Sequence, residues 1–133
     1  MALLFTYGSL KRGFPAHHLL EKARFLGETF TQRAKYKLVA IDDGSEDFAY
    51  PAIALNGTQS ISGELYEIDE KSFALIGVYE GEDYEAIDIA LQDGVTALCF
   101  ALKKSAYGKT ASQHAQITTR QDKRQYWRLP VQS

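Results

Sequence analysis

Hydrophobic residues recur along the chain in short runs that alternate with polar residues, a pattern typical of β-strands. The alternation is clearest near Ile61, Gly63 and Leu65, which fall on one face of a predicted strand. The dipeptide Asn56-Gly57 predicts a tight hairpin turn, and Gln92-Asp93-Gly94 predicts a second turn. Strands are expected at 2–7, 24–31, 36–41, 50–55, 61–68, 84–91 and 95–102.

Two segments carry the apolar spacing of short helices. The first is predicted to begin at Pro15, which suits the first turn of a helix, with Leu19 and Leu20 on its apolar face. The second is predicted over 70–80, where Asp69 can act as the N-cap. Two helices are too few to cover both faces of a parallel sheet.

These elements together predict the fold class. Tight turns between consecutive strands require antiparallel pairing. About seven strands and two short helices therefore predict an α+β domain with a small, mixed, strongly curved, barrel-like sheet. We place this domain at residues 1–102. Polar side chains dominate residues 103–133, which we expect to be a basic C-terminal extension of the same domain, loosely packed or mobile.

Charge is unevenly distributed along the sequence. The chain has 15 basic and 17 acidic residues, a formal net charge of −2, but residues 103–133 hold seven basic residues and one acidic residue. Because these basic residues are dispersed, we expect a solvated tail and no nucleic-acid partner. The alternative is a nucleic-acid-binding barrel in which Tyr126 and Trp127 serve as stacking platforms among the basic residues.

The cysteine content and the hydrophobic runs bear on the compartment. Cys99 is the lone cysteine, and a free thiol is typical of a reducing environment. No apolar run is long enough to span a bilayer, and Met1 is not followed by a secretory signal pattern. We therefore expect a cytoplasmic protein without a membrane partner. The oligomeric state does not follow from the sequence.

Metal and phosphate motifs do not occur in the sequence. Three histidines and one cysteine form no ligand pattern, and the adjacent His17 and His18 would point about 100° apart on a helix. The glycines form neither a dinucleotide fingerprint nor a phosphate loop. Cys99 lies in the apolar run 97–101 and is expected to be a core residue.

One loop and one carboxylate could carry chemistry. The first strand stops at Tyr7-Gly8-Ser9-Leu10, where glycine permits a sharp turn whose N–H groups can hold a carboxylate; the alternative is an ordinary turn. Glu80 follows Phe73 at i+7, so its carboxyl is expected to face a semi-apolar pocket with a raised pKa, as a general base requires. The alternatives are a solvent-facing Glu80 and a different base, Glu64.

Several segments resemble one known family. The run Phe-Thr-Tyr-Gly-Ser-Leu-Lys-Arg-Gly at 5–13 resembles the opening signature of the γ-glutamylcyclotransferase-like, or AIG2-like, proteins. Segments 50–53, 62–68 and 78–81 with Tyr84 resemble later segments of that family, in the same order. The resemblance extends over 3–102 and is strongest to the small bacterial members and the γ-glutamylamine cyclotransferases.

The resemblance implies a small mixed barrel and a reaction. The substrate-binding residues would be Tyr7, Gly8, Ser9 and Leu10, and Glu80 would be the catalytic general acid/base. The substrate would be a small γ-glutamyl amino acid or γ-glutamylamine, which is converted to 5-oxoproline and a free amine. Neither a metal nor an organic cofactor is implied.

Two positions depart from the family pattern. Gly77 and Ala86 stand where family members usually have Asp and Arg. These departures favour an alternative on the same fold, a non-catalytic barrel that binds a small molecule or a partner.

Overall fold

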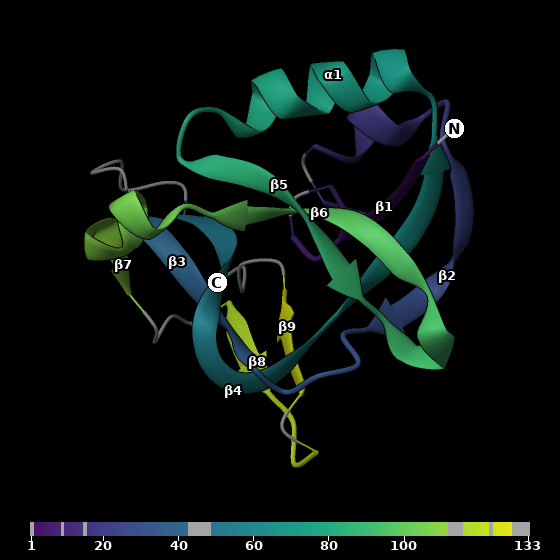
Figure 1. Cartoon of the computed structure of the whole chain (residues 1–133). Coiled ribbons are helices and arrows are strands. Elements are labelled where there is room, and N and C mark those ends of the chain that lie inside the picture. The colour runs from purple at the N-terminus through teal and green to yellow at the C-terminus, as the bar shows by residue number, and fades with distance from the viewer. Residues whose placement is uncertain are drawn as a thin grey trace.

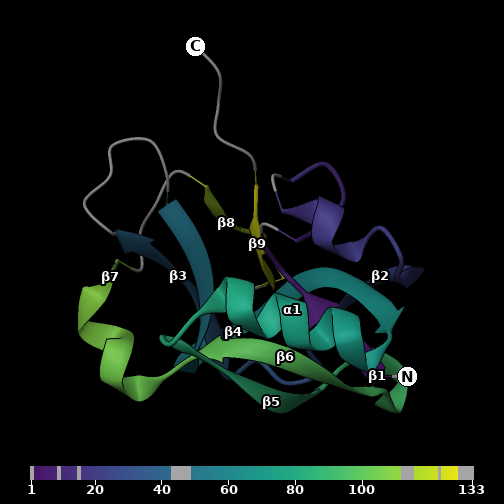
Figure 2. The ribbon, with the colours of Figure 1, turned by 90° about the horizontal axis from the view of Figure 1, so that it is seen from above.

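The computed structural model describes residues 2–8, 10–14, 16–42, 49–111, 116–122 and 124–128. These residues form a nine-stranded sheet with the longest helix, α1, lying across one end of it (Figures 1 and 2). The strands are β1 (Ala2–Thr6), β2 (Arg24–Phe30), β3 (Tyr36–Asp42), β4 (Ala49–Ile68), β5 (Tyr84–Ala90), β6 (Thr96–Leu102), β7 (Thr110–Ala111), β8 (Ile117–Thr119) and β9 (Arg124–Trp127). The helices are α1 (Glu70–Glu80) and the 3₁₀ segments η1 (His17–Leu20), η2 (Gln92–Gly94) and η3 (Lys104–Lys109).

Strand β4 is the centre of the sheet. Its first part pairs with β3, its second part pairs with β1 and β2, and Ser60-Ile61 pairs with β9. The predicted hairpin at Asn56-Gly57 is therefore wrong, because the two parts of β4 pair with other strands and not with each other. Instead, the register between β3 and β4 shifts from Lys37↔Ala54 to Tyr36↔Gln59. Asn56 and Gly57 lie between these two pairs, in a β-bulge of β4.

The sheet closes into a barrel, as the sequence predicted. The path β5-β6-β1-β4 continues into β2, and the isolated bridge Thr31↔Leu91 joins the end of β2 back to the end of β5. The Gln32 N–H donates to the Ala90 carbonyl at 2.9 Å beside this bridge. The sheet is mixed because β1 runs parallel to β6 and β4 runs parallel to β9.

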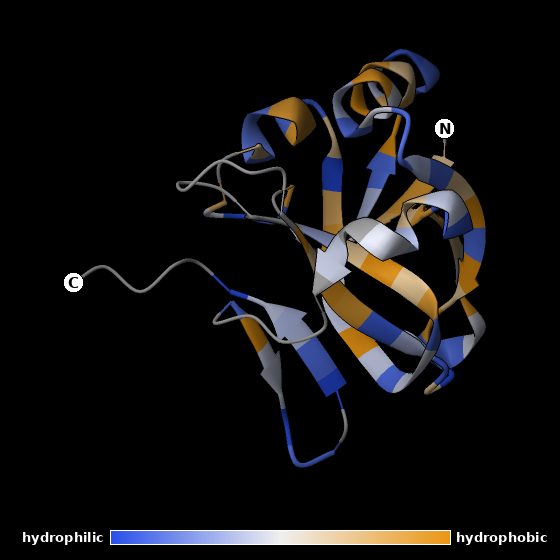
Figure 3. Cartoon of the chain, turned by 90° about the vertical axis from the view of Figure 1, so that its left-hand side faces the viewer, coloured by the Kyte–Doolittle hydropathy of each residue, from blue (hydrophilic) through white to orange (hydrophobic). Residues whose placement is uncertain are grey.

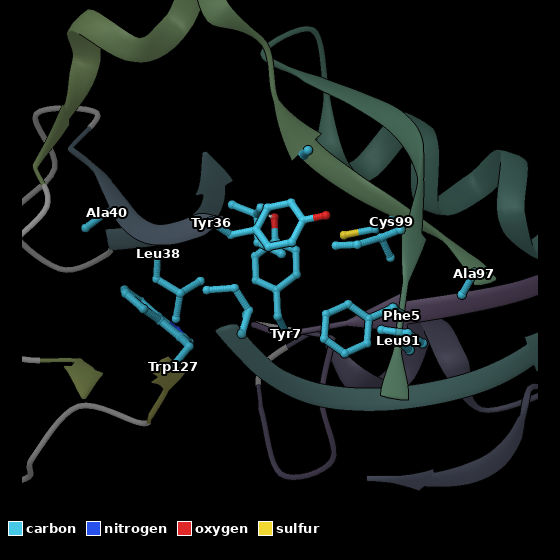
Figure 4. Close-up of a cluster of buried hydrophobic side chains, with 13 residues drawn as sticks. Phe5, Tyr7, Tyr36, Leu38, Ala40, Leu91, Ala97, Cys99 and Trp127 are labelled. Carbon is cyan, nitrogen blue, oxygen red and sulfur yellow. Dashed lines mark hydrogen bonds between the residues drawn. The ribbon is translucent and has the colours of Figure 1, made fainter. Parts of the chain in front are cut away.

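Hydrophobic and hydrophilic residues alternate along several strands (Figure 3), and side chains from one face of each strand form the barrel interior. The interior cluster includes Phe5, Tyr7, Leu38, Cys99 and Trp127 (Figure 4), so Cys99 is a core residue as expected. A second cluster packs α1 and η1 against the outside of the sheet. Its members include Leu4, Leu10, Leu20, Tyr66, Ile76 and Phe100.

The two predicted helices differ in outcome. Helix α1 has the predicted bounds, and the Asp69 carboxylate accepts from the Ser72 N–H at 2.7 Å as its N-cap. The first predicted helix is only one 3₁₀ turn at His17–Leu20, and Pro15 lies outside the described residues. The reason is local, since described residues in this part of the chain form i→i+3 hydrogen bonds, such as those from Leu19 N–H to the Ala16 carbonyl and from Ala23 N–H to the Leu20 carbonyl, and not the i→i+4 bonds of an α-helix.

The loose packing predicted after Leu102 is wrong for the described part of that segment. Trp127 is only 2% exposed and lies in the interior cluster beside Leu38 (Figure 4), and Ala106 is buried with β3. A Gln125 side-chain oxygen also accepts from the Leu38 N–H at 2.8 Å. Because Trp127 is buried, it cannot serve as a stacking platform for bases. Residues 129–133 lie outside the described residues.

Among the described residues, no helix is both long enough and apolar enough to cross a membrane.

Candidate functional site

A cavity of about 290 Å³ opens where the end of β1 meets the C-terminal end of α1. The structure brings four of the predicted site residues to its wall, namely Tyr7, Gly8, Leu10 and Glu80. Ser9 lies outside the described residues. The other described residues on the wall are mainly apolar or aromatic; they are Leu4, Phe5, Thr6, Ile41, Pro51, Tyr79, Asp83, Tyr84 and Phe100.

Tyr7 fixes the start of the loop by joining three strands. Its buried hydroxyl donates to the Phe100 carbonyl of β6 at 2.6 Å and accepts from the Ile53 N–H of β4 at 3.2 Å. Burial raises the pKa of Tyr7 well above its ordinary value, with Tyr84 adding to the effect. The phenol therefore stays protonated and holds β1, β4 and β6 together at the cavity.

Gly8 is required by a close approach of the chain to β4. A Cβ built on Gly8 would lie 2.2 Å from Cγ of Pro51, well inside van der Waals contact. The φ of Gly8 is not among the positive values, so the requirement is space and not an unusual backbone conformation. Tyr84 also holds Pro51, because its hydroxyl donates to the Pro51 carbonyl at 2.8 Å.

Glu80 is the last residue of α1 and faces the cavity from a half-buried position. Burial raises the pKa of its carboxyl from 4.5 to about 7. Gly81 follows with φ 85° and donates its N–H to the Gly77 carbonyl at 3.2 Å, so the helix ends and the chain turns away immediately after Glu80. A carboxyl with this pKa can both accept and return a proton near neutral pH.

The charges on the cavity wall have one sign. Glu80 and Asp83 are acidic, and the described wall residues do not include Lys, Arg or His. A ligand carboxylate in this cavity would therefore depend on backbone N–H groups of the loop, whereas a ligand ammonium would be attracted to the two acidic side chains.

Other candidates from the sequence lie away from this cavity. Glu64 is buried and bonded to Arg12, and it lines a different cavity from Glu80. His17 is half-buried, and its Nδ1 donates to the Leu10 carbonyl at 3.0 Å. Within the described ranges, His, Cys, Asp and Glu side chains do not gather in groups of three or more that could hold a metal ion.

Comparison with known proteins identifies the family. The sequence profile described as "Gamma-glutamyl cyclotransferase, AIG2-like" matches residues 4–128. This chain belongs to that family. The match includes β8 and β9, which the sequence resemblance had left out.

Named members of the family are similar to this chain in sequence, at modest identity. The chain is 32% identical over 90 residues to the Pyrococcus horikoshii protein named "Putative gamma-glutamylcyclotransferase PH0828", covering 67% of this chain and 69% of that protein. A crystal structure of PH0828 superposes with a TM-score of 0.61 over 84% of this chain and 86% of that one. The chain is also 30% identical over 84 residues to human gamma-glutamylaminecyclotransferase, covering 60% of this chain and 54% of the human protein.

A larger enzyme contains a similar fold. Kluyveromyces lactis allophanate hydrolase superposes with a TM-score of 0.73 and 23% identity over 84% of this chain. The chain spans only 19% of that protein. This likeness concerns the fold alone.

The two departures from the family pattern lie off the described cavity wall. A Cβ on Gly77 would be in ordinary contact with the Phe100 ring, at 3.8 Å. Ala86 lies on β5 and is exposed. Neither position is among the described wall residues, whereas Glu80 and the loop are.

Sequence reasoning missed several parts of the site. Pro51, Asp83 and Phe100 come from three different elements, so spacing along the chain could not bring them together. The contact between Arg12 and Glu64, behind the loop, was also missed, although the sequence carried a usable signal for it. Glu64 is two residues from Tyr66 in a strand and so shares its buried face, where a carboxylate requires a partner.

Proposed function

We propose that the protein is a γ-glutamyl cyclotransferase that releases 5-oxoproline and a free amine from a γ-glutamyl amino acid or γ-glutamylamine. One observation carries the proposal: Glu80, with a pKa raised to about 7, lines the same cavity as Tyr7, Gly8 and Leu10. Family membership and the relatives' names support the reaction class.

Binding would use both kinds of group on the wall. Backbone N–H groups of the loop hold the substrate α-carboxylate, since a cationic side chain is not among the described wall residues. Glu80 and Asp83 attract the α-ammonium. The apolar wall at Pro51 and Phe100 covers the aliphatic part of the γ-glutamyl group.

The chemical step is an intramolecular aminolysis. The Glu80 carboxylate removes a proton from the α-ammonium, and the neutral amine attacks the γ-carbonyl carbon. A new C–N bond closes the five-membered ring while the γ-amide C–N bond breaks. Glu80 then returns the proton to the leaving nitrogen, and the ring nitrogen loses its second proton to the released amine, which departs as an ammonium ion. Because nucleophile and carbonyl belong to one bound molecule, correct folding of the substrate can supply an effective molarity of ~10⁵–10⁸ M.

The test replaces the proposed base. Glu80→Gln keeps the size and hydrogen-bonding capacity of the side chain but cannot accept the proton, so 5-oxoproline release should fall by about 10²–10⁴-fold. Release is measured from a panel of γ-glutamyl amino acids and γ-glutamylamines, and binding of the same panel is followed by calorimetry. Binding should persist, because the loop holds the α-carboxylate.

Glu82→Gln is the matched control, since Glu82 is exposed two residues further along the chain. This variant should match the parent. If Glu80→Gln also matches a parent that turns over, Glu80 is not the base. If the parent binds members of the panel and releases 5-oxoproline from none of them, the non-catalytic binding barrel is the better description.

A further inference from the structure

A second carboxylate, Glu64, lies buried behind the substrate loop and takes no part in the proposed chemistry. It is 6% exposed and stands in β4 opposite Thr6 of β1 and Glu28 of β2. Gly63 lets β1 come this close, because a Cβ there would lie 2.2 Å from the Thr6 carbonyl oxygen. Glu64 thus stands on the central strand at the point where β1 passes into the loop.

Three donors converge on the Glu64 carboxylate. The Arg12 backbone N–H donates to Oε1 at 2.8 Å, and the Arg12 Nε–H donates to Oε2 at 3.1 Å. The Tyr66 hydroxyl also donates to Oε1, at 3.1 Å. One carboxylate therefore binds both the main chain and the side chain of Arg12.

Arg12 is held from its other sides as well. Its guanidinium stacks over the Phe25 ring at 3.9 Å and lies 3.7 Å from the exposed Glu28 carboxylate. The preceding residue, Lys11, donates from Nζ to the Trp127 carbonyl at 2.7 Å. The chain is thus anchored to β4 and β9 immediately after the loop that lines the cavity.

The loop itself spans the distance between two fixed points. Tyr7 is held before it by the bonds of its hydroxyl, and Arg12 is held after it by Glu64. The Lys11 N–H donates to the Gly8 carbonyl at 3.0 Å and closes the turn between them. The position of Gly8 and Leu10 on the cavity wall therefore depends on both anchors.

We infer that Glu64 is a positioning residue for the proposed cyclotransferase, fixing the loop at Tyr7–Leu10 through Arg12 so that the loop can receive the substrate α-carboxylate. This inference rests on the proposed function. Glu64 lies outside the described cavity wall, so it acts on substrate only through the loop. Burying the Glu64 carboxylate costs free energy, and its partner Arg12 has a side chain that is 51% exposed, so stability alone does not explain this pair.

The test compares Glu64→Gln with a matched change on the same strand. Glutamine keeps the shape but replaces a charged acceptor by a neutral one, which weakens the bond to the Arg12 N–H. We expect KM for a γ-glutamyl substrate to rise about fivefold to tenfold, with kcat and its pH profile unchanged. Glu67→Gln, three residues along β4 at a half-buried position, should change neither constant.

A readout without substrate separates this inference from the proposed function. Amide hydrogen exchange at Arg12 should be about fivefold to tenfold faster in Glu64→Gln than in the parent, and unchanged in Glu67→Gln. If the parent releases no 5-oxoproline, the proposed function fails, while the exchange rates still decide whether Glu64 holds the loop.

Three outcomes would overturn the inference. Unchanged KM and unchanged exchange would show that Glu64 does not hold the loop. A fall in kcat of about 10²-fold with an unchanged KM would place Glu64 in the chemistry instead. Arg12→Lys keeps the backbone N–H bond, so its KM should rise by less than about fivefold, and a larger rise would contradict the role of the backbone bond. This limit does not depend on Glu64→Gln, so it also applies if that variant does not fold.

Discussion

At the scale of single residues, Glu80 and Glu64 show that burial of a carboxyl group does not by itself decide what the group does. Both carboxyls leave bulk water, but Glu64 receives three donors while the pKa of Glu80 is raised by loss of solvent. A carboxylate with donors is held in place, and one that lacks solvent favours its protonated form. The first arrangement suits positioning and the second suits proton transfer.

The raised pKa of Glu80 predicts a pH-dependent effect on stability. Because the pKa in the folded state, about 7, exceeds the ordinary value of 4.5, the folded chain keeps a proton that the unfolded chain releases between these pH values. The stabilisation from this proton is therefore present at low pH and is lost as pH rises through about 7. Glu80→Gln should raise the melting temperature relative to the parent at pH 8 and have little effect at pH 4.

Thermal unfolding followed by circular dichroism at both pH values makes this comparison. Glu82→Gln, on an exposed residue, should have the same melting temperature as the parent at each pH value. An equal melting temperature for Glu80→Gln and the parent at pH 8 would mean that the ionised carboxylate is not destabilising.

At the scale of elements, the bend in β4 replaces the hairpin expected from the sequence. A Cβ on Gly57 would lie 2.2 Å from the Tyr36 carbonyl oxygen, and the Gly57 N–H donates to the Lys35 carbonyl at 3.2 Å. Glycine is needed here because two backbones touch. Gly57→Ala should destabilise the fold by about 1–3 kcal/mol, as overpacking typically does.

Chemical denaturation measures this loss against Gly108→Ala, where a Cβ would meet nothing within 4 Å. The control should stay within about 0.5 kcal/mol of the parent, as surface substitutions usually do. A Gly57→Ala variant as stable as the control would show that β3 and β4 can move apart without cost.

The strands were predictable because hydrophobic and polar residues alternate along them, and α1 was predictable because Asp69 provides its N-cap. The Asn56-Gly57 signal misled because turn propensity is local, whereas pairing depends on which strands are available, and β3 and β1 outcompete the other half of β4. The loop and Glu80 could be singled out from the sequence and its family resemblance. Their distance from Pro51 and Phe100 could not, since tertiary contacts decide it.

At the scale of the whole molecule, the C-terminal strands complete the barrel core. Trp127 belongs to the same interior cluster as Phe5 and Tyr7 (Figure 4). Trp127→Ala should therefore destabilise the fold by about 3–5 kcal/mol, the range for removing a buried large aromatic side chain. Denaturant titration measures the loss.

Tyr126→Ala is the neighbouring control, because Tyr126 is half-buried and the Arg120 guanidinium lies over its ring, 4.8 Å from the ring centre. We expect a smaller loss from it than from Trp127→Ala. Equal losses would indicate that the hairpin of β8 and β9 contributes as a unit rather than through the indole in the core.

The bond from Lys11 to the Trp127 carbonyl joins residues 116 positions apart, and β9 pairs directly with β4. During synthesis on the ribosome, more than a hundred residues follow Lys11 before Trp127 is made and the two can meet. Until β9 follows, the core lacks its indole and β4 lacks a neighbour at Ser60-Ile61. Until β9 has been synthesised, apolar core surface therefore stays exposed to chaperones, and the segment after the loop lacks the bond from Lys11 to the Trp127 carbonyl.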